Sequence, residues 1–126
     1  MFLLDTNTVI YYLKASLPTN AMQVLGNIID DQPAISVISK IELLCFNTPN
    51  INEQNITNKF VEASLIFNLD DDIINQTIAL RKQYKIKLPD AIIAATALVY
   101  NLTLITHNIA DFDKVPNLQL TDPHLL

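Results

Sequence analysis

Three acidic residues lie beside or within apolar stretches of this chain. Asp5 ends the apolar run at the start of the sequence, Glu42 lies inside an apolar segment, and Asp90 opens a segment rich in alanine. An ionised carboxylate in apolar surroundings is unfavourable unless it is paired or bound to a cation. Carboxylates that converge also raise one another's pKa until a cation relieves their repulsion. Mg²⁺ or Mn²⁺ suits such an oxygen-only site, and either ion supports hydrolysis of a phosphodiester.

Each of these acids also has an ordinary structural explanation. Asp5 could cap the first helix, although Thr6 or Asn7 could cap that helix equally well. Glu42 could point to solvent, and Asp90 could simply favour the positive end of a helix. The chemical interpretation therefore depends on whether the three carboxylates meet in the folded chain.

Two further polar residues follow the apolar segment Leu102–Ile105. Asn108 and Asp111 lie in the turn after Thr106, and either side chain could reach the sheet edge near Asp5. The alternative is a helix cap and an exposed acid on a turn. The joint placement of all these groups is a stronger indication of a site than any one of them.

Short apolar runs alternate along the chain with segments of helical periodicity. Strands are predicted at Phe2–Leu4, Ala34–Val37, Ile66–Leu69, Leu102–Ile105 and Leu118–Leu120. Helices are predicted at Thr8–Leu13, Thr19–Asp30, Ser39–Phe46, Ile56–Phe67, Asp70–Lys85, Pro89–Tyr100 and Asn108–Phe112. This alternation predicts an α/β fold, a mainly parallel sheet with helices on both faces. Sites in such folds lie at the carboxyl ends of the strands, which are here Asp5, Ser36, Asp70 and the Thr106–Asp111 turn.

Composition narrows the class of protein. The chain has 126 residues, of which 50% are hydrophobic, so one domain over residues 1–126 is expected and intrinsic disorder is excluded. A single glycine excludes glycine-rich phosphate loops. The lone Cys45 excludes a disulfide framework and a cysteine zinc site, and its apolar neighbours predict burial. No signal peptide or membrane span is recognisable, so a cytoplasmic location is expected.

The charge distribution bears on partners. A net charge of −5 argues against a broad basic face for nucleic acid. The one basic cluster is either a solvated helix face or a contact for RNA phosphates, and it comprises Arg81, Lys82, Lys85 and Lys87. Only 17% of residues are charged, which favours a partner or self-association. His107 is next to the expected site but is interpreted as a surface residue or one that supports the ligands from behind, and His124 is interpreted as inert.

Four blocks of sequence resemble PIN-domain ribonucleases, in particular the VapC-like toxins of type II toxin–antitoxin systems. The resemblance extends from Phe2 to Leu120, and the block around Asp90 is its most specific part. The blocks are Leu3–Asn7, Ser39–Leu43, Leu88–Ala97, and Leu104–Asn108 with Asp111–Phe112.

The resemblance implies a three-layer α/β/α sandwich with an acidic core formed by Asp5, Glu42 and Asp90. Asp5 and Asp90 would be the main ligands of Mg²⁺ or Mn²⁺, and Glu42 would position the attacking water. It also implies an RNA substrate, a homodimer, and a VapB-like antitoxin that blocks the site.

The fourth acidic position of the family is the neutral Asn108 in this chain. Asp111 matches the acid that precedes the family's phenylalanine and would supply the missing charge. Thr6 and Thr106 would order water or carboxylates through hydrogen bonds.

Three alternatives stay open at this point. Because of Asn108, the chain could be an inactive PIN module that only binds its antitoxin. A haloacid-dehalogenase-like phosphatase could use Asp5 as nucleophile, but residue 7 is Asn and no Gly-Asp motif follows. A receiver-like signalling module fits the length and the alternation, but Asp5 stands alone and Lys114 does not follow a predicted strand.

Overall fold

The computed structural model describes residues 1–126, and its central element is a parallel sheet of five short strands. These are β1 (Phe2–Leu4), β2 (Ala34–Ser36), β3 (Leu65–Phe67), β4 (Thr103–Ile105) and β5 (Leu120–Thr121). Their order across the sheet is β3-β2-β1-β4-β5, and every neighbouring pair is parallel. Receiver modules have the order 2-1-3-4-5, so the strand order excludes that alternative.

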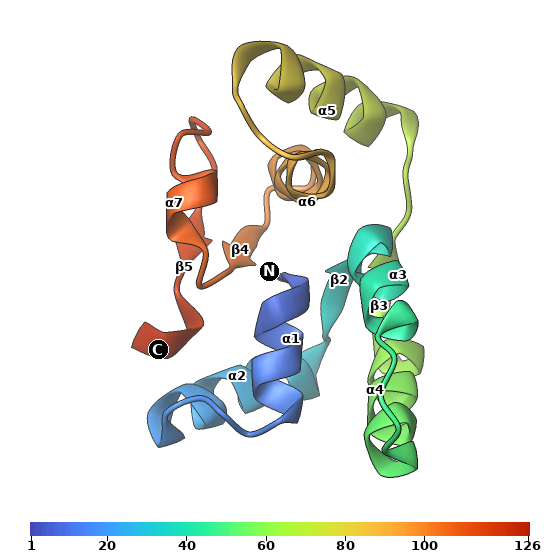
Figure 1. Ribbon diagram of the computed structural model, residues 1–126. Helices are drawn as coiled ribbons and strands as arrows, with labels where there is room; N and C mark the ends of the chain where they lie inside the picture. The colour runs from blue at the N-terminus through green and yellow to red at the C-terminus, as the bar shows by residue number, and fades with distance from the viewer.

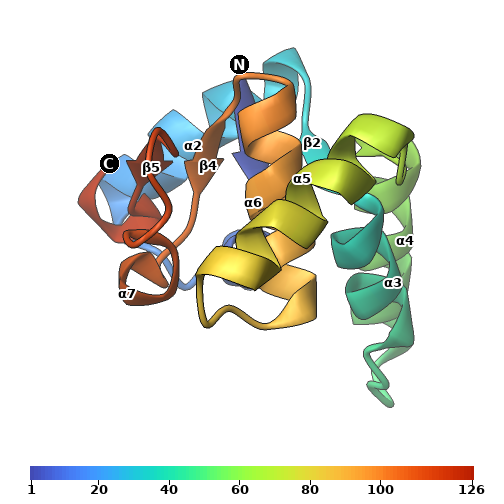
Figure 2. The ribbon, with the colours of Figure 1, turned by 90° about the horizontal axis from the view of Figure 1, so that it is seen from above.

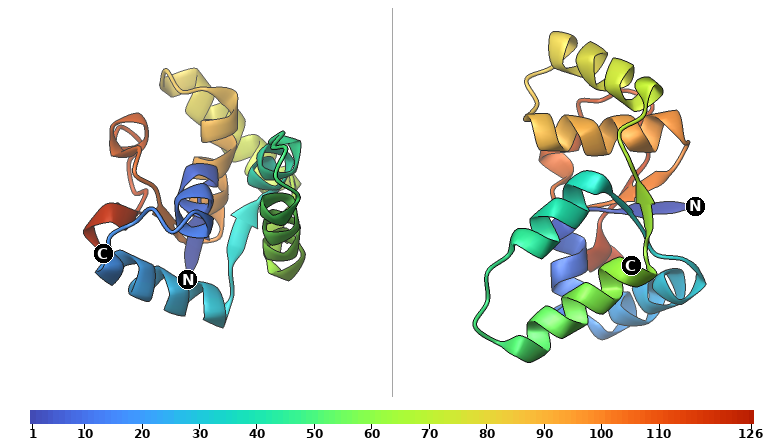
Figure 3. Two further views of the ribbon diagram at one scale, coloured as in Figure 1. Left: turned by 60° about the horizontal axis from the view of Figure 1, so that its bottom comes forward. Right: turned by 90° about the vertical axis from the view of Figure 1, so that its right-hand side faces the viewer.

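Helices cover both faces of the sheet (Figure 1). They are α1 (Thr6–Leu13), α2 (Thr19–Asp31), α3 (Val37–Cys45), α4 (Ile51–Ala63), α5 (Asp71–Gln83), α6 (Leu88–Val99), α7 (Ile109–Phe112) and the 3₁₀ helix η1 (Pro123–Leu125). Figure 2 shows α5 and α6 crossing above the strands, and Figure 3 shows α3 packed beside α4. The predicted α/β/α sandwich is confirmed.

Two apolar cores lie on opposite sides of the sheet. Successive residues of a strand point to opposite faces, so Leu3 belongs to the core beneath α5 and α6, and Leu4 belongs to the core against α1–α4. The segment Ala91–Ala97 of α6 is buried all round. Its small side chains let this helix lie close to the sheet, which brings the start of α6 to the carboxyl end of the strands.

Several element boundaries differ from the predictions. Helix α1 begins at Thr6 because Asp5 is its N-cap, accepting a hydrogen bond at 2.8 Å from the backbone N–H of Thr8. Phe67 was predicted both at the end of a helix and within the strand Ile66–Leu69, and the structure places it at the end of β3. The last strand is Leu120–Thr121 rather than Leu118–Leu120, because its register follows the pairing of Leu104 with Leu120.

Cys45 is exposed, and the prediction of its burial was wrong. It is the last residue of α3, and apolar residues occur on more than one side of that helix: Leu43 is buried, while Leu44 and Phe46 are exposed. No helix combines the length and hydrophobicity needed to cross a lipid bilayer.

Candidate functional site

Asp5 lies buried at the carboxyl end of β1. One of its oxygens accepts the Thr8 backbone N–H at 2.8 Å. Burial raises the pKa of the Asp5 carboxyl above its ordinary value, and the nearby charge of Glu42 raises it further, whereas the polar groups of Thr106 and Thr8 lower it. Asp5 is thus both a helix cap and a buried acid whose ionisation is unfavourable without a cation.

Glu42 extends from α3 to Thr6, the residue next to Asp5. The Thr6 hydroxyl donates a hydrogen bond to Glu42 Oε1 at 2.6 Å, and the Ser39 hydroxyl lies 3.0 Å from the Thr6 hydroxyl. Thr6 has one proton to donate, so Ser39 can complete the chain as donor to Thr6. Glu42 therefore points toward the end of β1 although it is exposed to solvent.

Asp90 lies in the first turn of α6, half-buried, and no protein group donates a hydrogen bond to its carboxylate. Burial raises the pKa of Asp90, and the charges of Asp111, Asp5 and Glu42 raise it further, while Lys87 lowers it. The other three carboxylates are therefore close enough to Asp90 for their charges to repel its own. The four carboxylates come from four separate elements.

The turn after β4 positions the fourth carboxylate, which is that of Asp111. Asn108 donates a hydrogen bond from its side-chain amide to Asp111 Oδ2 at 2.6 Å, and its backbone N–H donates to Thr106 Oγ1 at 3.0 Å. Thr106 is fully buried beside Asp5. Asn108 thus orients Asp111 instead of adding a charge of its own.

The donor set of this acidic cluster fits a hard divalent cation. Asp5 and Asp90 offer carboxylate oxygens whose ionised forms are disfavoured by burial and by each other, and neither histidine lies among them. Oxygen-only ligation of this kind suits Mg²⁺ or Mn²⁺. A cation would relieve the repulsion that Lys87 and the hydrogen bonds to Asp5 offset only in part.

A cavity of about 670 Å³ adjoins the acidic cluster. Asp90 and Asp111 lie on its wall, together with the basic residues Arg81, Lys85, Lys87 and Lys114. Lys82, predicted with this basic group, does not line it. Lys114 was missed by the sequence analysis because it is distant in sequence; its ammonium group donates to the Lys85 carbonyl at 2.7 Å.

Asp70 lies away from the acidic cluster, although it follows β3. It caps α5 through the backbone N–H of Ile73 and accepts a hydrogen bond from the Tyr100 hydroxyl. Tyr100 follows the last turn of α6, whereas Asp90 is in the first. Four strand ends were predicted as places for a functional site. The end of β3 contributes no carboxylate to the acidic cluster.

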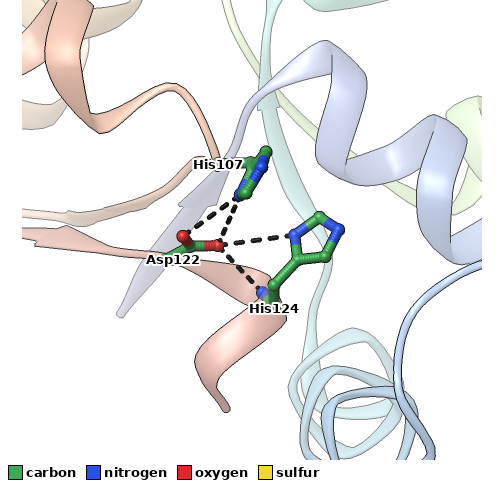
Figure 4. Close-up of side chains that lie close together, drawn as sticks. All are labelled: His107, Asp122 and His124. Carbon is green, nitrogen blue, oxygen red and sulfur yellow. Dashed lines mark hydrogen bonds and ion pairs between the residues drawn. The ribbon is translucent and has the colours of Figure 1, made fainter.

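A second polar cluster, also missed by the sequence analysis, joins His107, Asp122 and His124 (Figure 4). His107 Nδ1 lies 3.0 Å from Asp122 Oδ1, and His124 Nδ1 lies 3.4 Å from the same oxygen. The two histidines, neither of which was interpreted from sequence as a ligand, are thus neighbours. The Asp-Pro-His run at 122–124 was the available signal.

Comparisons with known proteins identify the fold. A profile of the PIN domain matches residues 2–118. A search of curated protein sequences gave no match.

Among solved structures, a toxin–antitoxin complex from Klebsiella pneumoniae matches with 32% identity and a TM-score of 0.75, covering 98% of each chain. VapBC-1 from nontypeable Haemophilus influenzae matches with 27% identity and a TM-score of 0.78, covering 97% of each chain. VapBC2 from Rickettsia felis, bound to a DNA fragment from its promoter, matches with 26% identity and a TM-score of 0.79, covering 95% of this chain and 96% of that one. The chain belongs to the PIN domain family. Within that family it is VapC-like, as its four sequence blocks predicted.

Proposed function

We propose that this protein is a metal-dependent endoribonuclease and the toxin of a toxin–antitoxin pair. PIN domains are generally nucleases that use a divalent metal. The observation that carries the proposal is the convergence of the carboxylates of Asp5, Glu42, Asp90 and Asp111 beside a cavity lined by basic side chains. We propose that residues 1–126 act as one such domain.

Asp5 and Asp90 would hold Mg²⁺ or Mn²⁺, with Asp111 adding charge at the rim. A divalent cation in this position lowers the pKa of a water and stabilises negative charge on a phosphodiester. Glu42, held by Thr6, is placed to orient that water and to accept its proton. The Asn108 amide holds Asp111 in place. Because the substrate is cellular RNA, we propose that the protein acts in the cytoplasm.

Basic residues on the cavity wall would bind the RNA backbone. Arg81, Lys85 and Lys87 come from the end of α5 and the loop before α6, and Lys114 follows α7. Lysine and arginine contacts to phosphates position a nucleic acid without reading its sequence. They also offset the acidic cluster, which by itself would repel a polyanion.

An apolar groove between α1, α3 and α4 is the surface that we propose for the antitoxin. A cavity of about 190 Å³ there is lined by apolar residues from all three helices: Ile10, Leu13, Leu43, Phe46 and Ile56. Phe46 and Ile56 are 55% and 48% exposed, so they are available to a partner. That several similar structures are toxin–antitoxin complexes supports this partner. A homodimer is a further proposal, supported by the resemblance alone.

Asp5→Asn and Asp90→Asn test the nuclease proposal. Each change removes a metal-binding charge, so we expect Mg²⁺-dependent cleavage of RNA by the purified protein to fall at least about 100-fold, because a catalytic ion supplies several kcal/mol. Growth inhibition on expression should disappear with it. Asp113→Asn, which alters an exposed acid just after α7, is the matched control.

Wild-type rates of cleavage in both variants would contradict the mechanism. Absence of cleavage by the wild-type protein across RNA substrates would favour an inactive module that only binds its antitoxin. A phosphatase that uses Asp5 as nucleophile is not favoured, because this carboxylate is buried and caps α1.

A further inference from the structure

The cluster of His107, Asp122 and His124 contains both histidines of the chain and lies apart from the four carboxylates. His107 follows β4, and Asp122 and His124 follow β5. These two strands are parallel neighbours at the edge of the sheet, so their carboxyl ends lie side by side. One ring nitrogen from each histidine and one oxygen from Asp122 lie within 4.8 Å of one another.

Two separations within the cluster are close to those between the ligand atoms of a metal ion, and the third is below 4.8 Å. Asp122 Oδ1 is 3.0 Å from His107 Nδ1 and 3.4 Å from His124 Nδ1 (Figure 4). With metal–ligand bonds of about 2.0–2.1 Å and tetrahedral angles, ligand atoms lie about 3.3–3.4 Å apart.

One ligand atom makes no hydrogen bond, and its polar neighbour, Asp122 Oδ1, lies 3.4 Å away. His124 Nδ1 is buried and makes no hydrogen bond, although its ring is held by neighbours on two sides. The His107 and His124 ring centroids are 4.0 Å apart, and Tyr11 of α1 packs edge-on against His124 at 5.3 Å. A buried polar atom without a hydrogen bond is unfavourable, and a bound ion would satisfy it.

The carboxylate is already oriented for ligation. Asp122 Oδ1 accepts a hydrogen bond from the His124 backbone N–H at 2.9 Å, as the N-cap of η1. This contact fixes the Asp122 carboxylate beside the Nδ1 atoms of both rings. The Asp122 and His124 side chains are only 16% and 31% exposed, so two of the three groups are preorganised by the fold.

We propose that His107, Asp122 and His124 form a binding site for Zn²⁺ or a similar divalent transition-metal ion. Two imidazole nitrogens and one carboxylate oxygen are a donor set found in zinc sites with a fourth position open to water. Imidazole ligands favour such ions over Mg²⁺, which distinguishes this site from the acidic cluster. Both imidazoles bind in the neutral form, with the proton on Nε2. The ion ties the end of β4 to the last residues of the chain.

Titration of the metal-free full chain with ZnCl₂ in excess Mg²⁺ tests the proposal, because, on the function proposed above, Mg²⁺ occupies the acidic cluster. We expect calorimetry to show one Zn²⁺ per chain and Co²⁺ to give the visible absorption of a tetrahedral site. Both histidine imidazole resonances should shift on addition of Zn²⁺. His107→Gln and His124→Gln should each weaken Zn²⁺ binding at least about 100-fold, since loss of even a hydrogen-bond partner of a ligand costs 10–100-fold.

Matched variants separate this site from a general effect of charge or folding. Asp122→Asn should weaken Zn²⁺ binding, whereas Asp113→Asn, the same change on an exposed acid, should not. Melting of each variant without metal establishes that it folds. No Zn²⁺ binding in excess Mg²⁺, or equal affinity in wild type and both histidine variants, would overturn the proposal. So would Zn²⁺ binding that Asp5→Asn abolishes and the histidine variants retain.

Discussion

Asp5 is both a helix cap and a buried acid. It caps α1 through the Thr8 N–H, and its burial raises the pKa of its carboxyl. Asparagine caps helices about as well as aspartate, so Asp5→Asn keeps the cap and removes only the charge. This makes loss of activity in that variant interpretable as loss of a charged ligand rather than loss of α1.

Thr6→Val tests whether the hydrogen bond to Glu42 matters for turnover. Valine has the shape of threonine without the hydroxyl, so Glu42 loses its 2.6 Å donor and is free to rotate. A hydrogen bond to a charged group is worth about 1.5–3 kcal/mol, so kcat for RNA cleavage should fall about 10-fold or more, with the Mg²⁺ dependence unchanged. Thr6→Ser keeps the hydroxyl and should restore most of kcat. A wild-type kcat for Thr6→Val would show that Thr6 does not position Glu42.

At the scale of elements, α3 links the acidic cluster to the apolar groove. It presents Glu42 toward the end of β1 and Leu43 and Phe46 toward the groove with α1 and α4. Because both surfaces lie on one helix, an occupant of the groove contacts the helix that carries Glu42. A partner bound at the groove is therefore positioned to block access to the acidic cluster.

Ile56→Asp tests the groove. A charge buried without a partner in an apolar contact lowers the binding affinity, so co-purification with a co-expressed VapB-like antitoxin should drop at least about 10-fold. Ile78→Asp on α5 is the matched control, since Ile78 is 50% exposed and Ile56 is 48% exposed. Equal loss of the partner in both variants would place the contact elsewhere.

At the scale of the whole molecule, the acidic cluster opposes the stability of the metal-free fold. The pKa values of Asp5 and Asp90 are raised above 3.8, so the folded protein holds protons that the unfolded chain has already released. The stabilisation that this retention of protons gives the folded state is fully present below pH 3.8. It is lost as the pH rises through the raised pKa values of Asp5 and Asp90. Asp70 and Asp122 have lowered pKa values and act in the opposite sense, losing their contribution as the pH falls below 3.8.

Thermal unfolding of the metal-free protein should therefore show stability declining as the pH rises above 3.8 through the raised pKa values. Added Mg²⁺ should reverse much of that decline, because it binds the ionised, folded form. Asp5→Asn and Asp90→Asn should flatten the decline and remove the effect of Mg²⁺, whereas Asp113→Asn should preserve both. If neither variant alters the profile, the two carboxyls do not carry the unfavourable charge.

The local pattern of the chain was enough to predict its elements and its family. Apolar periodicity and the alternation of runs depend on neighbouring residues, so the strands, most helices and the acidic blocks around Asp5, Glu42 and Asp90 could be recognised from the amino-acid sequence alone. Boundaries failed where tertiary pairing decides them, as at β5, whose register follows Leu104.

Only the tertiary structure decided which side chains meet. Lys114 joins the basic wall of the cavity, Asp70 turns to Tyr100 instead of the acidic cluster, and His107 reaches His124 through Asp122. These contacts depend on how β1, β4 and β5 align, which is a property of long-range pairing between segments. Residue types and their local spacing determine what chemistry is available, while the alignment of parallel strands determines which groups are close enough to perform it together.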